Sequence, residues 1–175
     1  RAGEVGIDLE RLGKIRNRAR VVSLVLVDAA AADIGPGVVR VGLDRHIKLI
    51  EKYRWASAPV NLFRQTTERV RNEVEAFGYN EELGSYTRAL NGDHLDASAL
   101  TFSLVGYTKS SSSRMHSTIE CLEKHLSKNN MVFRYRGRDG IEEDEGCFGI
   151  CNFWLSENLA RSGRIERAIE IFEAT

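Results

Sequence analysis

Residues 60–78 read VNLFRQTTERVRNEVEAFG and decide how the rest of the chain is interpreted. Apolar or small side chains recur every three or four positions along this stretch, which is the spacing of one face of an α-helix. The residues concerned are Leu62, Thr66, Val70, Val74 and Phe77. Gly78 follows directly and is a common helix stop. The stretch therefore predicts a helix over residues 60–77.

The residues upstream repeat the same pattern. Leu43, Ile47 and Ile50 are four and three positions apart and predict an amphipathic helix over residues 41–54. Its basic residues then face outward; they are Arg45, Lys48 and Lys52. Pro59 marks the connection to the second helix, so the two helices are expected to pack as an antiparallel hairpin.

Downstream, a loop with a short strand pair is expected over residues 79–95, because glycines and an Asn-Gly step interrupt it. A third helix is predicted to begin behind Asp96 and to end at Gly106. The fourth helix should bury one apolar stripe and end at Asn129 and Asn130. That stripe consists of Met115, Ile119, Leu122 and Leu126.

The C-terminal third is expected to add a fifth and a sixth helix, separated near Gly163. The fifth carries Phe148, Phe153, Trp154, Leu155 and Leu159, and the sixth carries Ile165, Ala168, Ile169 and Phe172. About six helices joined as antiparallel pairs, with short irregular or hairpin connections, are typical of an all-α toroid or solenoid.

Composition limits the classes of function. The chain has 175 residues, 42% hydrophobic and 29% charged, with 25 Lys+Arg against 25 Asp+Glu. This length suits one domain that buries roughly 70% of its unfolded surface. A balanced charge argues against a nucleic-acid partner.

The sequence also argues against a membrane partner and a metal site. No stretch approaches the roughly 18 apolar residues that a membrane span needs. The three cysteines, Cys121, Cys147 and Cys151, have no paired-ligand spacing, and the four histidines are scattered. Reduced thiols of this kind favour a cytoplasmic location. We expect no metal and no other cofactor.

One all-α interpretation is a protein-binding scaffold. The tail from Ser156 to Thr175 resembles a unit of a tetratricopeptide-type repeat. Such an array needs a copy about 34 residues upstream. The aromatic and arginine-rich residues 130–139 show no comparable pattern, so this interpretation stays the alternative.

A second interpretation rests on short segments that occur in a fixed order. They are Val41-Gly42-Leu43-Asp44-Arg45, Leu95-Asp96-Ala97-Ser98, Arg134-Tyr135-Arg136 with Asp139-Gly140-Ile141, Glu145-Gly146-Cys147-Phe148, and Cys151-Asn152-Phe153-Trp154. From about Val38 to the end, including Gly-Arg-x-x-x-Ala at 163–168, the chain resembles the C-terminal part of the bacterial-type glycoside hydrolase family 15 catalytic domain. That family contains glucoamylases, glucodextranases and a trehalase-like branch, and the trehalase-like branch is the most similar.

The resemblance implies a partial (α/α)6 barrel and inverting hydrolysis of α-glucosidic bonds such as those of trehalose or α-glucans. Inversion needs a protonated carboxyl and a carboxylate roughly 6.5–9.5 Å apart. The family pattern places the general base at Glu145, in a loop that also holds Glu142, Glu143 and Asp144. Without the resemblance, that loop would be interpreted as a solvated acidic surface.

The general acid of the family, a Glu directly after a Trp, has no counterpart in this chain. Residues 1–37 do not resemble the family and form a separate N-terminal segment, ahead of the family-like part at residues 38–175. We therefore expect the isolated chain not to catalyse. Half a barrel would also expose apolar faces, which predicts self-association.

Four further residues are candidates for contact with the α-glucoside. Asp96 is expected either to cap the third helix or to bind sugar. Tyr135 and Trp154 either stack on a glucose ring or pack in the core, with packing favoured for Trp154. Arg134 flanks the substrate channel or lies on the surface.

Overall fold

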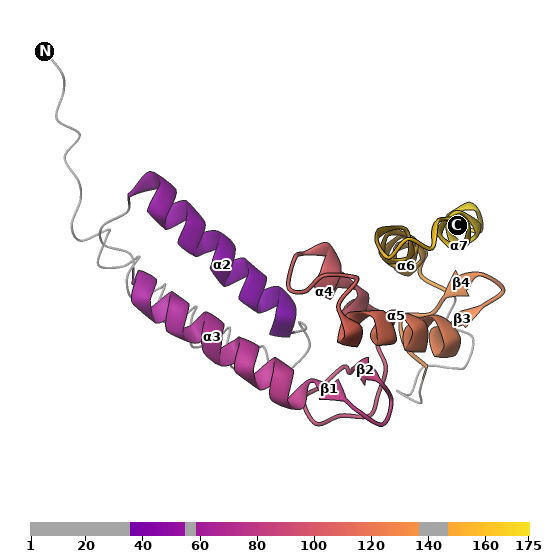
Figure 1. Ribbon diagram of the computed structural model, residues 1–175, viewed down its shortest axis with the longest axis horizontal. Coiled ribbons are helices and arrows are strands. Elements are labelled where there is room, and N and C mark those ends of the chain that lie inside the picture. Colours follow the sequence, from indigo (N-terminus) through magenta and orange to yellow (C-terminus); the bar gives the residue numbers. More distant parts are fainter. Residues whose placement is uncertain (1–35, 55–58, 137–146) are drawn as a thin grey trace, which may run out of the picture.

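The computed structural model describes residues 36–54, 59–136 and 147–175 and shows a chain of helical pairs with two small hairpins between them (Figure 1). The first pair consists of α2 (Pro36–Tyr53) and α3 (Val60–Phe77), whose bounds match the predicted hairpin except at the start. Helix α2 begins five residues earlier than predicted because proline is tolerated in the first turn of a helix.

The connection from α3 contains the predicted strand pair. Strands β1 (Tyr79–Asn80) and β2 (Ser85–Tyr86) pair antiparallel, with Tyr79 opposite Tyr86. Gly84 closes the turn with φ +65°, a conformation that side chains with a Cβ rarely adopt. The pair is covered by α5, so that the Tyr86 amide donates to the Thr118 hydroxyl at 3.1 Å.

The predicted third helix is confirmed in its bounds, but its first turn is a 3-10 turn. The segment forms a single 3-10 turn, η1 (Ala97–Leu100), followed by one α-helical turn, α4 (Thr101–Leu104). Hydroxyls compete for its carbonyls: Thr101 Oγ1 donates to the Ser98 carbonyl at 2.6 Å. Gly106 then ends the segment with φ +85°, as predicted for that end.

The fourth helix is confirmed as α5 (Ser113–Leu126), and its predicted stripe of Met115, Ile119, Leu122 and Leu126 is fully buried. It ends at Leu126, earlier than the predicted Asn129. The two asparagines instead form the turn between β3 (Ser127–Lys128) and β4 (Met131–Val132), with φ of 53° and 63°. Positive φ at both central residues is the requirement of a tight hairpin turn.

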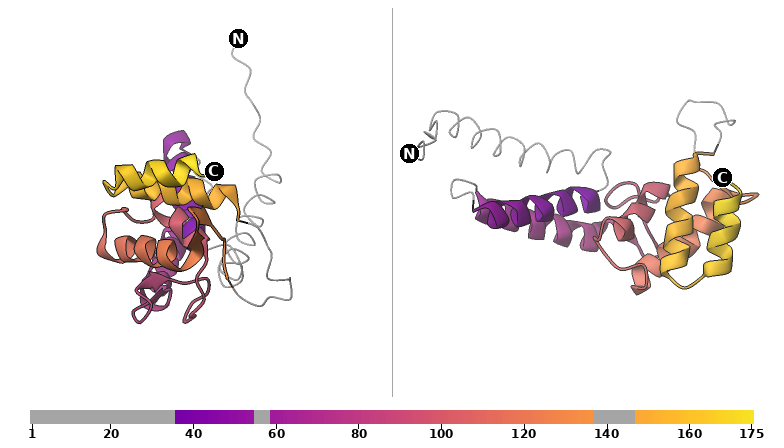
Figure 2. Two further views of the ribbon diagram at one scale, coloured as in Figure 1. Left: turned by 90° about the vertical axis from the view of Figure 1, so that its right-hand side faces the viewer. Right: turned by 90° about the horizontal axis from the view of Figure 1, so that it is seen from above.

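Helices α6 (Gly149–Arg161) and α7 (Ile165–Glu173) form the last pair, separated by Gly163 at φ +86° as predicted. Leu155 and Leu159 are buried, whereas Phe148 and Phe153 are about half exposed. The α6–α7 pair lies at the opposite end of the elongated chain from α2 and α3 (Figure 2). The described part is thus all-α in class, a partial helical toroid.

Two apolar clusters hold this arrangement. The main cluster runs through η1, α4, α5, α6 and α7 and reaches α2 and α3 through Val41, Val70 and Val74. A smaller cluster of Leu43, Ile47, Ile50 and Phe63 lies within the α2–α3 pair alone. The main cluster therefore positions the candidate site, which lies on its η1 side.

Candidate functional site

Asp96 lies directly before η1 and is 3% exposed. Its Oδ1 accepts a hydrogen bond from the Ser98 amide at 2.7 Å, which satisfies one of the free amides at the start of the turn. The capping role considered for Asp96 is therefore confirmed, and its second oxygen is left for another partner.

That partner is Arg134. After β4, the Phe133 amide donates to the Leu126 carbonyl at 2.9 Å, and the Ala97 amide donates to the Arg134 carbonyl at 2.7 Å. These backbone bonds set residue 134 beside residue 97, so that Arg134 Nε lies 3.6 Å from Asp96 Oδ2. A buried carboxylate needs such a partner, because an isolated buried charge is costly. The chain thus brings two predicted site residues together across almost 40 positions of sequence.

Tyr135 extends the same group. The guanidinium of Arg88 lies over the Tyr135 ring, 5.3 Å from its centroid. Arg88 comes from the loop after β2, where its amide donates to the His94 carbonyl at 2.9 Å. The sequence alone gave no signal for Arg88, because an arginine in a polar loop is usually a surface residue.

A small hollow joins these residues. Its lining consists of Thr87, Arg88, Asp96, Ser98, Ala99, Phe102 and Arg134. About 20 Å³ of it is open to a water-sized molecule. Ligand pockets typically measure 300–1,000 Å³. The described residues therefore supply one polar wall and not a complete ligand pocket.

Two predicted site residues lie apart from this wall. Trp154 is half-buried and packs against the main apolar cluster, in agreement with the favoured packing role, and it does not line the hollow. Glu145, the predicted general base, lies outside the described residues, as do Glu142, Glu143 and Asp144.

Cys151 lies beneath the Asp96–Arg134 pair at the start of α6. Burial, together with the negative charge of Asp96, raises the pKa of this thiol to about 11. A thiol with so high a pKa stays protonated near neutral pH and is a poor nucleophile. Cys151 is thus part of the packing under the site, in keeping with the reduced cysteines expected from the sequence.

Two buried asparagines on α6 fix both halves of the wall. The side-chain Nδ2 of Asn158 donates to the Leu100 carbonyl at 2.9 Å, and its Oδ1 accepts from the Ser103 hydroxyl. These two bonds anchor η1 and α4. Asn152 Oδ1 accepts from the Val132 amide at 2.7 Å, and its Nδ2 donates to the Asn130 carbonyl at 2.9 Å, which anchors the β3–β4 hairpin. Helix α6 therefore holds the segments that carry Asp96 and Arg134.

A second polar cluster gathers around Glu75 of α3. The Tyr107 hydroxyl donates to Glu75 Oε1 at 2.7 Å, and Arg114 lies 3.2 Å from Oε2. Arg114 also pairs with Glu81 at 2.8 Å and lies over the Tyr79 ring. This cluster links α3, β1, the loop after α4, and α5, and none of its members lines the hollow beside Asp96. Its role is to join elements.

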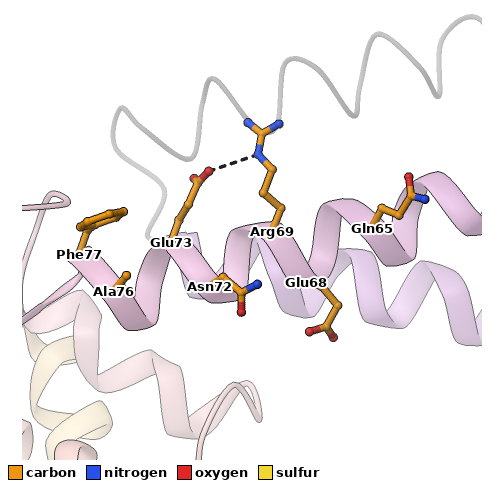
Figure 3. A pocket seen from close by; sticks show the side chains of 7 residues that line it. All are labelled: Gln65, Glu68, Arg69, Asn72, Glu73, Ala76 and Phe77. Atoms are coloured by element: carbon orange, nitrogen blue, oxygen red, sulfur yellow. Dashed lines mark hydrogen bonds and ion pairs between the residues drawn. The ribbon is translucent and has the colours of Figure 1, made fainter.

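The other hollows are open surface. Figure 3 shows one along α3, where Arg69 and Glu73 form an ion pair of 3.2 Å. All of its lining residues come from one helix, so they cannot enclose a ligand. In the described ranges, no group of three His, Cys, Asp or Glu side chains is placed to hold a metal ion. Nor does any helix within the described residues have the length and apolarity to cross a membrane.

Comparison with known proteins relates the chain to trehalases. It is 32% identical over 136 residues to a trehalase of Mycolicibacterium smegmatis, covering 76% of this chain and 20% of that protein. A trehalase of Thermoplasma volcanium is 28% identical over 119 residues, covering 67% of this chain and 19% of that protein. The chain thus spans about a fifth of the length of these relatives. No family model matches it.

Solved structures show the same relationship at the level of the fold. A glycosidase variant in complex with glucose superposes with a TM-score of 0.67 at 21% identity, covering 79% of this chain and 36% of that one. The wild-type glycosidase superposes equally well, with a TM-score of 0.67. The repeat-scaffold alternative is not favoured. In sequence the chain is therefore similar to part of the trehalases, and its helical fold is that of part of a glycosidase.

Proposed function

We propose that the chain supplies part of a catalytic domain that hydrolyses α-glucosidic bonds with inversion, as glycoside hydrolase family 15 does, with trehalose as the first candidate substrate. The similarity to trehalases over 119–136 residues carries this proposal. The polar wall of Asp96 and Arg134, with Tyr135 beside it, supports it, because sugar hydroxyls are bound by charged and aromatic side chains of this kind.

The proposed roles follow from what inversion requires. Glu145 acts as the general base and takes a proton from the attacking water. Asp96, Arg134 and Tyr135 contact the sugar, whereas Trp154, the fourth candidate, packs against the main apolar cluster. Asp96 does not suit the role of general acid, because it accepts a hydrogen bond from the Ser98 amide and faces a guanidinium. The Trp-Glu pair that carries the acid in the family is absent from the 175 residues, so the proposal takes the acid from outside them. The free cysteines favour cytoplasmic activity.

Glucose release from trehalose, maltose and starch tests the proposal. The assay compares the 175-residue chain with the chain extended upstream by the matching helices of a trehalase relative. We expect release by the extended protein, with equal initial amounts of α- and β-glucose from trehalose, and β-glucose from the non-reducing end of maltose and starch, by NMR. Glu145→Gln should lose activity at least about a thousandfold. Glu143→Gln, in the same acidic loop, is the matched control and should retain activity. A folded extended protein that releases no glucose would refute the hydrolase assignment.

A further inference from the structure

One of the open hollows is lined from several elements instead of one. It lies between the loop after α4 and the last residue of α6, and its lining consists of residues 106–111 with Ser103 and Arg161. We call it the Ser110 hollow. About 610 Å³ of it is open to a water-sized molecule, a volume in the range of small-molecule sites.

Contacts between neighbouring helices fix the walls of this hollow. Figure 1 shows α4 between the α2–α3 pair and α6. On one side, the Tyr107 hydroxyl donates to Glu75 of α3 at 2.7 Å. On the other side, Arg161 Nη1 donates to the Ser103 carbonyl at 3.3 Å. The hollow is thus formed where α4 meets its two neighbours, and not by the outer face of the first or the last helical pair.

The charged side chains that line the hollow are both cations, Lys109 and Arg161. Lys109 is exposed and forms no ion pair within the described ranges. Arg161 pairs with Glu157 through Nη2, but a guanidinium carries more N–H donors than this pair and the bond to Ser103 use. No carboxylate is among the described residues of the lining. The hollow therefore favours an anion.

Ser110 supplies a donor that the described protein leaves unused. It is only 6% exposed, and its hydroxyl has no hydrogen-bond partner among the described residues. Protein atoms enclose the unpaired hydroxyls of Thr67 and Ser127, whereas Ser110 lines the hollow. The amides of Lys109, Ser110 and Ser111 likewise donate to no acceptor within the described ranges. Because unpaired polar groups in a buried position are costly, these donors indicate a bound acceptor.

Helix α5 adds to the preference for negative charge. It begins at Ser113, directly after the loop, and its N-cap residue Ser112 makes no side-chain capping bond. Its first turn contains no acidic residue. The positive end of the helix dipole is therefore not offset by a side chain of the helix itself.

We propose that the Ser110 hollow binds the phosphate monoester of a small polyhydroxylated molecule, such as a sugar phosphate. Lys109, Arg161 and the loop amides hold the phosphate oxygens, because charge-assisted hydrogen bonds to phosphate are strong. A phosphate group alone fills only part of the hollow, and the remainder is lined by the hydroxyl residues Thr108 and Ser111. The Ser110 hollow shares no lining residue with the hollow beside Asp96, so the proposal does not depend on the proposed hydrolysis.

Isothermal titration calorimetry on the full 175-residue chain tests the ligand class. Glucose 6-phosphate is the probe, and glucose, inorganic phosphate and sulfate are the comparisons. We expect glucose 6-phosphate to bind at least tenfold more tightly than each of the three. Equal affinity for inorganic phosphate or sulfate would overturn the proposal, as would the absence of binding. The same titration on the upstream-extended protein should give the same affinity, and loss of binding there would also overturn it.

Two variants test the residues. Lys109→Glu and Ser110→Ala should each weaken binding at least about tenfold, because each removes a donor to a charged group. Ser110→Ala should leave the free energy of unfolding unchanged, since its hydroxyl has no protein partner among the described residues. Lys48→Glu, the same charge change on the exposed side of α2, is the matched control and should bind like the wild type. Circular dichroism verifies folding, and folded variants that bind like the wild type would refute the site.

This test is separate from that of the proposed hydrolysis. Binding is measured without catalysis, so a chain that binds no sugar phosphate leaves the glucose-release assay to decide the hydrolase assignment. Conversely, an extended protein that releases no glucose but binds glucose 6-phosphate in a Ser110-dependent way supports the site and refutes only the hydrolase.

Discussion

At the scale of single residues, the hydrogen bond from Tyr107 to Glu75 is the clearest target for a test of stability. The hydroxyl is 2.7 Å from a carboxylate oxygen, and Tyr107 is 7% exposed. Because a bond to a charged group contributes about 1.5–3 kcal/mol, Tyr107→Phe should lower the free energy of unfolding by that amount. Urea unfolding measures it. Tyr79→Phe is the control and should change the value by less than about 0.5 kcal/mol, and equal losses in both variants would contradict the assignment.

The same tyrosines predict a dependence of stability on pH. Burial and the nearby Glu75 raise the pKa of Tyr86 to about 12, and they also raise the pKa of Tyr107. Between the ordinary tyrosine pKa of about 10 and these raised values, the folded chain holds more protons than the unfolded chain, so stability falls as pH rises.

The check is urea unfolding at pH 9 and at pH 11, in the wild type and in the double variant Tyr86→Phe, Tyr107→Phe. The wild type should lose more stability between the two pH values than the variant does. Other groups titrate in both proteins and cancel in the comparison. Identical losses would show that the tyrosines do not carry the effect.

How much of the site the sequence could reveal is also decided residue by residue. The capping role of Asp96 follows from a local rule, since an acidic side chain before a turn accepts from an amide two positions on. The pairing of Asp96 with Arg134 depends on backbone bonds between segments far apart in sequence. The spacing of residues within one segment does not indicate such long-range bonds. The position of Arg88 beside Tyr135 and the cluster around Glu75 therefore could not be predicted from the sequence.

At the scale of elements, the β3–β4 turn is a test of backbone conformation. Asn129 has φ of 53°, where a β-branched residue is strained by about 1–2 kcal/mol and glycine is not. Asn129→Val should therefore destabilise the chain by about that amount, and Asn129→Gly should leave stability equal or slightly higher. Asn72→Val on the exposed side of α3 is the control for the β-branched side chain. An equal response at both positions, measured by urea unfolding, would contradict this account of the turn.

Elements with a strong apolar period were predictable, and the 3-10 form of the turn behind Asp96 was not. The stripe of α5 is buried as its spacing indicated. The segment behind Asp96 also has apolar residues at helical spacing. There the Thr101 and Ser103 hydroxyls donate hydrogen bonds to backbone carbonyls three residues earlier in the chain. The Asn158 side chain of α6 also donates to the Leu100 carbonyl of this turn. The conformation of the turn therefore depends on a long-range contact that the local sequence pattern does not show.

At the scale of the whole molecule, the two apolar clusters predict unequal stability along the chain. The smaller cluster lies within α2 and α3 alone, whereas the main cluster joins the remaining helices and the ends of α2 and α3 that face them. Sequence periodicity predicted the helical pairs but could not show this division, because it does not report which pairs touch. Segments with fewer buried contacts open first in the native state.

Amide hydrogen exchange on two core variants tests the division. Ile47→Ala removes a side chain of the smaller cluster, and Leu122→Ala removes one of the main cluster; both are buried, at 8% and 1% exposure. Truncations of this kind cost about 2–5 kcal/mol. Ile47→Ala should lower protection in residues 43–50 and 60–63 while α5 and α6 keep theirs, whereas Leu122→Ala should lower protection throughout the described helices. If Ile47→Ala lowers protection in α5 and α6 as strongly as in α2, the two clusters unfold as one, and the α2–α3 pair is not a separate unit of stability.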